Sequence, residues 1–83
     1  MASPQSLEVA RRARLLYDEQ LRQDLERDHT NEFVAIEPDS AQYFLGATLS
    51  DAIQAARRAF PDRLPFALRI GHASTVHLGA FTT

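Results

Sequence analysis

Two histidines near the end of the chain, His72 and His77, are the residues whose type and spacing most directly allow metal chemistry. A short turn between two strands would bring their imidazoles together, and neutral imidazole nitrogens are common ligands of zinc, copper and nickel. A protein metal site usually needs a third or fourth ligand, and neither His29 nor Asp62 stands at a spacing typical of one. We therefore predict no metal site, and we expect both histidines to flank a partly solvated turn.

Glu37 and Asp39 bracket Pro38 and form a second candidate pair. Two carboxyl groups can share acid and base roles when their surroundings push their pKa values apart. This pair falls on an expected turn, where both carboxylates would be solvated. The chain also contains no glycine-rich phosphate loop, no G-x-S-x-G segment and no H-E-x-x-H segment. The sequence thus predicts no catalytic residue, no cofactor and no enzymatic activity.

Arg57 and Arg58 lie on the polar side of an expected helix, and together with Arg63 they could dock an acidic partner. Cations near the C-terminal end of a helix also stabilise it through the helix dipole, so a solvated helix face is the simpler interpretation of these arginines. Tyr43, in an expected strand, fits either the core or an interface as an aromatic side chain with a polar tip. Arg57, Arg58 and Tyr43 are kept as candidate interface residues.

The nine basic residues are all arginine, and eleven carboxylates outnumber them, so the formal net charge is −2 at pH 7. A nucleic-acid-binding protein needs a concentrated positive face to neutralise several phosphates. Neither half of this chain is basic. We therefore expect no nucleic-acid partner.

The length of 83 residues predicts one domain. The absence of cysteine excludes disulfides and thiolate metal sites. No apolar stretch approaches the roughly 20 residues of a membrane-spanning helix, and no secretory signal is visible. The apolar fraction of 45% and charged fraction of 24% are typical of a globular domain. We therefore expect a cytoplasmic location and no membrane partner.

Helical periodicity dominates the first third of the chain. Pro4 after Ser3 is typical of a helix start, and Ala13, Tyr17 and Leu25 recur at helical spacing up to about residue 28. A second helix is predicted from Thr48, whose side chain would cap it three residues before Asp51, to a stop at Pro61. Its apolar stripe consists of Leu49, Ala52, Ile53, Ala56 and Phe60.

Four strands are predicted around the second helix. They cover residues 33–36, 42–45, 66–70 and 75–78, with a hairpin turn at 37–40 between the first two. The fold class is therefore α+β with the order α-β-β-α-β-β. We expect one domain over 1–83, made of an N-terminal helix and linker (1–31) and a β-β-α-β-β unit (32–83). The predicted sheet is antiparallel in the order 2-1-3-4, with both helices packed on one face.

Four segments carry a resemblance to known proteins, namely Glu32 to Glu37, Tyr43 to Gly46, Thr48 to Ile53, and Pro65 to Gly71. Together with the preceding helix, they resemble a group of short bacterial proteins of unknown function. That resemblance implies a small αβ domain and assigns no catalytic residue. A looser resemblance, over the segment Gly46 to Ile53 after a hairpin, is to the HicB type of antitoxin domain.

The leading hypothesis is a non-enzymatic protein-interaction module that self-associates or binds a protein partner. Its motivation is the hairpin, which is apolar on both faces and would leave one face for a second copy to cover. The candidate interface residues are Val34, Ile36, Tyr43, Leu45, Arg57 and Arg58. One alternative is a HicB-like antitoxin or regulator that neutralises a toxin. A further alternative is a small enzyme or metal-binding protein that uses His72 and His77, with Glu37 as a possible third group.

Overall fold

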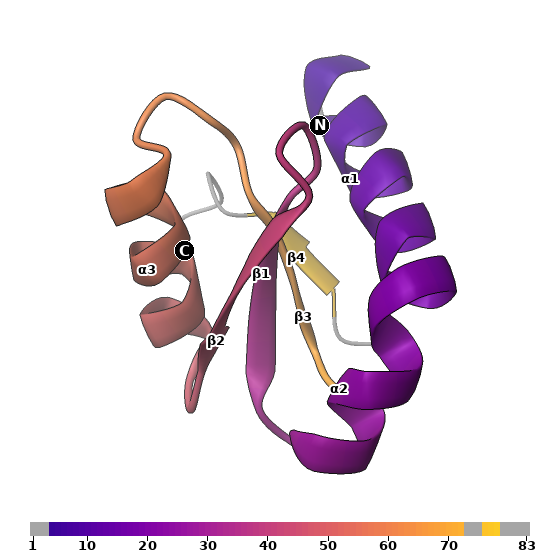
Figure 1. Ribbon diagram of the computed structural model, residues 1–83. Helices are drawn as coiled ribbons and strands as arrows, with labels where there is room; N and C mark the ends of the chain where they lie inside the picture. The colour runs from indigo at the N-terminus through magenta and orange to yellow at the C-terminus, as the bar shows by residue number, and fades with distance from the viewer. Residues whose placement is uncertain (1–3, 73–75, 79–83) are drawn as a thin grey trace.

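The computed structural model of the protein describes residues 4–72 and 76–78, with the side chains of residues 7–72 (Figure 1). The chain begins with a long helix in three parts: α1 (Pro4–Leu16), a π-helical turn η1 (Tyr17–Leu21) and α2 (Arg22–Asp28). Within η1 the hydrogen bond skips one residue more than in an α-helix, because the backbone N–H of Arg22 donates to the carbonyl of Tyr17. The helix ends where the N–H of His29 donates to the carbonyl of Leu25.

A hairpin follows the long helix. Strand β1 (Phe33–Glu37) pairs antiparallel with β2 (Gln42–Gly46), so that Val34 lies opposite Leu45 and Ile36 opposite Tyr43. On its other side β1 pairs antiparallel with β3 (Phe66–Arg69), and β3 pairs with the short strand β4 (Val76–Leu78). The sheet order is β2-β1-β3-β4, which places β1 at the centre and β2 at one edge.

Helix α3 (Leu49–Ala59) starts as the sequence predicts. The side-chain oxygen of Thr48 accepts a hydrogen bond from the backbone N–H of Asp51 over 3.1 Å. This cap satisfies one of the free N–H groups of the first turn. The last residue of the preceding strand is Gly46, where a Cβ would lie 2.5 Å from the backbone nitrogen of Ala52. Only a residue without a side chain allows β2 to approach α3 so closely.

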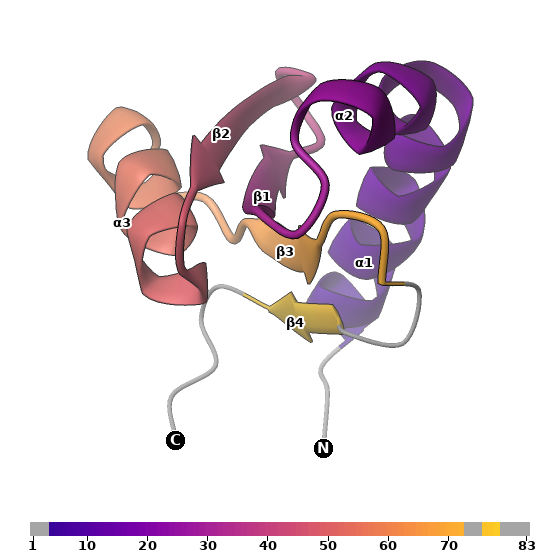
Figure 2. The same cartoon turned by 90° about the horizontal axis from the view of Figure 1, so that it is seen from below.

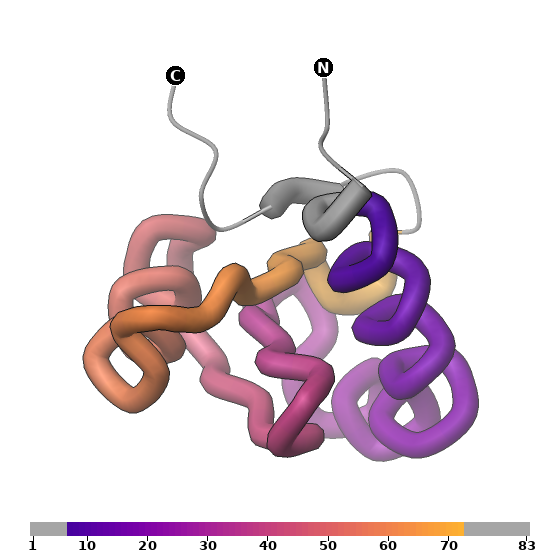
Figure 3. The backbone as a smooth tube through the Cα atoms, turned by 90° about the horizontal axis from the view of Figure 1, so that it is seen from above, coloured from indigo at the N-terminus to yellow at the C-terminus, as the bar shows by residue number. Residues whose placement is uncertain are grey.

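The two helical elements lie on opposite faces of the sheet, as Figures 2 and 3 show. On one face, the long helix covers large side chains of β1 and β3. This first core cluster contains Ala13, Tyr17, Leu25, Val34, Ile36, Phe66, Leu68 and Ile70. On the other face, α3 packs through small residues, and the second core cluster contains Ala35, Ala52, Ala56 and Ala67. The prediction that both helices share one face is therefore wrong.

The physical reason lies in β1 and β3, whose alternate residues are apolar on both faces. Val34 and Ile36 point towards the long helix, whereas Ala35 points towards α3. A strand buried on both faces needs a cover on each. This chain supplies both covers itself, so the face that we expected to remain open is closed.

The α+β class and the antiparallel pairing of β2, β1 and β3 are confirmed. The predicted element order is not matched in detail, because η1 interrupts the long helix and β4 has three residues. Thr75, where we expected the last strand to begin, lies outside the described residues. Among the helices of the described residues, none combines the length and the apolar character that crossing a bilayer requires.

Candidate functional site

The turn between β1 and β2 holds the predicted carboxylate pair in an unexpected setting. Glu37 is 2% exposed, and its side chain accepts hydrogen bonds from the backbone N–H groups of Asp39 (3.1 Å) and Ser40 (2.9 Å). The guanidinium of Arg63 lies 3.8 Å from Oε2 of Glu37. The prediction that both carboxylates are solvated is therefore wrong for Glu37. Its burial is possible because N–H donors and a cation replace water around the carboxylate.

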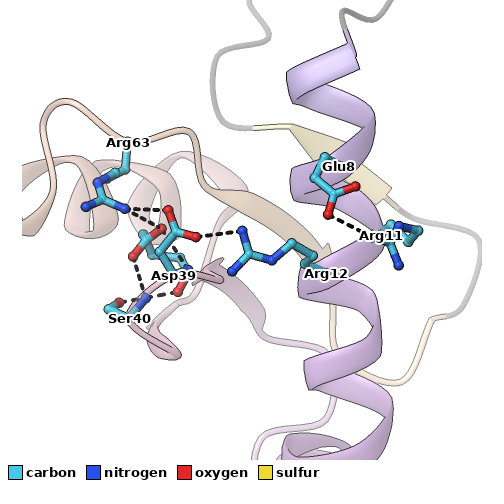
Figure 4. Close-up of polar contacts among 7 residues, drawn as sticks. Glu8, Arg11, Arg12, Asp39, Ser40 and Arg63 are labelled. Carbon is cyan, nitrogen blue, oxygen red and sulfur yellow. Dashed lines mark hydrogen bonds and ion pairs between the residues drawn. The ribbon is translucent and has the colours of Figure 1, made fainter.

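Asp39 joins this turn to two other elements (Figure 4). One carboxylate oxygen lies 2.6 Å from Nη1 of Arg12 in α1, and the other lies 2.5 Å from Nη1 of Arg63, in the segment between α3 and β3. We call Arg12, Asp39, Arg63 and Glu37 the turn network. It ties α1 and the segment after α3 to the hairpin, an arrangement that fits a structural role better than proton transfer.

The predicted histidine pair is only partly described. The Nε2 atom of His72 lies 2.6 Å from Oδ1 of Asn31, and His72 is exposed as expected. His77 lies in β4 opposite Ala67, but its side chain is outside the described part of the chain. His29 contacts Glu32, with 3.1 Å between Nδ1 and Oε2. Within the described residues, no three histidine, aspartate or glutamate side chains gather closely enough to hold a metal ion.

The candidate interface residues fall into three places. Val34 and Ile36 are fully buried beneath the long helix, so they are core residues and cannot form a surface. Their predicted role as interface residues is therefore wrong, because the long helix covers the sheet face that we expected a second copy to cover. Arg57 and Arg58 are exposed in the last turn of α3.

The remaining two candidates lie on the edge strand β2. Tyr43 is 42% exposed, and Leu45 is half-buried against the first core cluster. Because Tyr43 lies opposite Ile36, both side chains belong to the face that the long helix covers. The helix does not extend far enough over β2 to bury the tyrosine. Tyr43 is therefore the candidate interface residue that the structure leaves accessible at the sheet edge.

The edge formed by β2 lacks the usual protection against pairing with another strand. Natural proteins block exposed edges with charged residues, proline or bulges. The five residues of β2 include no charge and no proline, and they pair with β1 without interruption. The uncharged run extends from Ser40 to Ser50 in a chain in which 24% of residues are charged. In Figure 1, β2 is the strand nearest the viewer, with no described element on its outer side.

A small pocket lies between the long helix and the end of β3, and sequence reasoning missed it. Its volume is about 160 Å³. The helix contributes Arg14, Tyr17, Asp18, Arg22 and Glu26 to its lining, and the segment that ends β3 contributes Leu68, Arg69, Gly71 and His72. The π-helical turn begins at Tyr17, so the pocket forms where the helix departs from regular geometry.

Tyr17 is the most buried polar side chain of this pocket. It is 3% exposed, and its hydroxyl donates a hydrogen bond to Oε2 of Glu26 over 3.2 Å. Burial, reinforced by the negative charge of Glu26, raises the pKa of Tyr17 to about 12. The phenol is thus held in its neutral form, in which it donates a hydrogen bond.

Comparison with known proteins found no matching family model, no matching curated protein and no matching solved structure. The resemblances to short bacterial proteins and to HicB-type antitoxins stay predictions. The function is therefore inferred from the geometry of the edge strand and the pocket.

Proposed function

We propose that the protein is a non-catalytic interaction module that self-associates by pairing the β2 edge of one copy with the β2 edge of a second. The carrying observation is an uncharged, unprotected edge strand with Tyr43 exposed beside it. Two such edges would join antiparallel about a twofold axis, in the way that closed dimers most often form. The two sheets would become one continuous sheet.

The distribution of charge supports a second copy as the partner. In a twofold antiparallel pair, a residue on the axis faces itself in the other copy, and residues on either side of the axis face one another, so a charge close to the axis would lie close to the same charge of the other copy. Like charges opposite one another in a sheet are destabilising. The uncharged run of residues 40–50 removes this repulsion at the edge, although the chain as a whole carries a net charge of −2.

Burial of Tyr43 gives the pairing a side-chain contribution beyond the backbone hydrogen bonds. Tyrosine is enriched where interfaces bury much area, because its ring is large and loses little conformational freedom. Pairing would also shield Leu45, which is half-buried in one copy. A five-residue edge buries less area than a standard interface of about 800 Å² per partner, so we expect a dimer with an affinity in the micromolar range.

Sedimentation equilibrium over a range of protein concentrations tests this function. The wild type is expected to shift from monomer to dimer as its concentration rises. Tyr43→Lys places a charge on the edge of each copy and is expected to keep the protein monomeric. Gln42→Lys, at an exposed position of the same strand, should also raise the dissociation constant of the dimer.

Leu15→Lys is the matched control, because Leu15 is also an exposed apolar residue, at 51%, but lies on α1. This change adds the same charge and should leave the dimer intact. A wild type that stays monomeric at high micromolar concentration would refute the proposal. So would a dimer that Leu15→Lys disrupts and the two β2 variants do not.

A further inference from the structure

The pocket at the π-helical turn is independent of the β2 edge and has its own chemistry. Its lining combines three arginines with two carboxylates, which leaves a formal charge of +1 when His72 is neutral. The chain as a whole is negative, at −2. Positive charge is therefore concentrated at this concave surface in a protein that otherwise carries an excess of acids.

The two carboxylates of the lining already share one cation. Arg22 lies between them, with Nε 3.2 Å from Glu26 and Nη1 3.9 Å from Asp18. A metal ion would have to displace this guanidinium, and the described residues offer no group of three metal-ligating side chains. The pocket is therefore poorly suited to a cation.

Of the other two lining arginines, Arg69 donates a hydrogen bond to the backbone carbonyl of Asn31 over 3.2 Å, which leaves Arg14 as the arginine without a hydrogen bond. Its Nε lies 3.7 Å from Asp18, which is beyond hydrogen-bond distance, and its side chain is 35% exposed. The N–H groups of this guanidinium thus have no hydrogen-bond acceptor among the described residues. A planar guanidinium with free donors is the group that proteins use to hold carboxylates and phosphates through paired hydrogen bonds.

The backbone around the pocket has two features that regular structure does not require. Single π-helical turns are rare and are frequently found at functional sites. Gly71, on the opposite wall, has φ +86°, a conformation that favours glycine. Both features place unusual backbone at the same cavity, and Tyr17 adds a buried hydroxyl in its neutral form.

We propose that this pocket binds a small oxyanion, the phosphate or carboxylate group of a small molecule, with Arg14 as its main anchor. A volume of about 160 Å³ suits a group of this size and is smaller than the pockets of drug-sized ligands. Leu68 contributes an apolar wall that would exclude water from one side of the anion. Arg14 would exchange its long contact with Asp18 for direct hydrogen bonds to the ligand.

Titration followed by ¹⁵N NMR tests this site. Inorganic phosphate, sodium acetate and sodium chloride are added separately at matched ionic strength, and the amide signals of Tyr17 and Gly71 are followed. Saturable shifts with phosphate or acetate, but not with chloride, are expected. Whichever of phosphate and acetate has the lower dissociation constant assigns the ligand group as a phosphate or a carboxylate.

Arg14→Gln should weaken the binding by at least about tenfold, the loss expected when a charged hydrogen-bond donor is removed. Arg11→Gln is the matched control, since it removes the same charge from an exposed position of the same helix and should leave the affinity unchanged. The site is refuted if neither oxyanion gives saturable shifts, if chloride gives the same shifts, or if both variants weaken binding equally. Should Arg14→Gln fail to fold, the wild-type titration against chloride decides by itself.

Discussion

The hydroxyl of Tyr17 donates a hydrogen bond to the carboxylate of Glu26 over 3.2 Å, although the two residues are nine positions apart along one helix. In a regular α-helix, nine residues make about 2.5 turns, so the two side chains would leave opposite sides of the helix. The π-helical turn over Tyr17–Leu21 holds more residues than a regular turn and rotates the part that follows it. That rotation brings Glu26 to the side of Tyr17 and forms one wall of the pocket.

Removing this hydroxyl gives the first prediction. Tyr17→Phe deletes the donor and keeps the ring in the core, so it should lower the free energy of unfolding by about 0.5–1.5 kcal/mol near neutral pH. Urea denaturation of the two proteins measures the difference. Because Arg22 still contacts Glu26, the carboxylate keeps a partner in the variant and the loss should stay in this range.

The same pair predicts a dependence on alkaline pH. The pKa of Tyr17 is about 12 in the folded protein against an ordinary value of 10.0, so the folded state keeps a proton that the unfolded chain has lost. The stabilisation is present in full below pH 10 and is lost as the pH rises towards 12. The stability of the wild type minus that of Tyr17→Phe should be constant below pH 10 and fall steadily above it. A value that stays constant or rises above pH 10 would contradict the assigned pKa.

The turn network predicts an effect that depends on salt. Asp39→Asn removes a charge that faces Arg12 and Arg63 together, and it should cost about 1 kcal/mol of unfolding free energy at low ionic strength. Added salt should reduce the loss, because the side chain of Asp39 is half-exposed and its interactions are screened.

Glu8→Gln is the control for this network. It breaks the exposed pair of Glu8 with Arg11, which lies within a single helix and joins no separate elements (Figure 4). We expect a change below about 0.5 kcal/mol. If the two substitutions cost the same in urea denaturation, the turn network does not hold the layers together.

The contact between β2 and α3 predicts that Gly46→Ala is strongly destabilising. An added Cβ would lie 2.5 Å from the nitrogen of Ala52 and 2.8 Å from Cβ of Asp51, and the first of these is backbone that cannot rotate away. We expect a loss of about 1–3 kcal/mol, the range for overpacking. Thermal unfolding by circular dichroism checks it, with Ala47→Gly, at an exposed position next to it, as the milder comparison. An unchanged melting temperature for Gly46→Ala would show that α3 is not held this close to the strand.

Much of the fold could be predicted from local patterns. The capped start of α3 at Thr48 and the stop before Pro61 follow from residue chemistry alone, and both are confirmed. The inner place of β1 is that of the predicted strand order 2-1-3-4. The sheet face on which α3 packs was not predicted. The buried residues of α3 are alanines such as Ala52 and Ala56, and small side chains contribute little to a hydrophobic pattern.

The pocket was missed because sequence patterns assume regular helices. Ala13, Tyr17, Leu21 and Leu25 recur strictly every four residues, whereas a helix of 3.6 residues per turn makes such a stripe drift around its axis. Over three steps these side chains would rotate away from the face of the helix that packs on the sheet. The π-helical turn, which holds more residues per turn, reduces that rotation. The unbroken four-residue repeat was therefore the available signal. The edge location of β2 was contained in the predicted strand order, but the exposure of Tyr43 depends on how far the long helix reaches over the sheet.

Amide hydrogen exchange in β2, measured at several protein concentrations, tests the proposed self-association most directly. Amides of β2 that do not pair with β1 would gain hydrogen bonds when two edges pair. The proposal predicts that some amides among Gln42–Gly46 exchange more slowly as the concentration rises, and that Tyr43→Lys abolishes this dependence. Exchange in β2 that is the same at every concentration would contradict it.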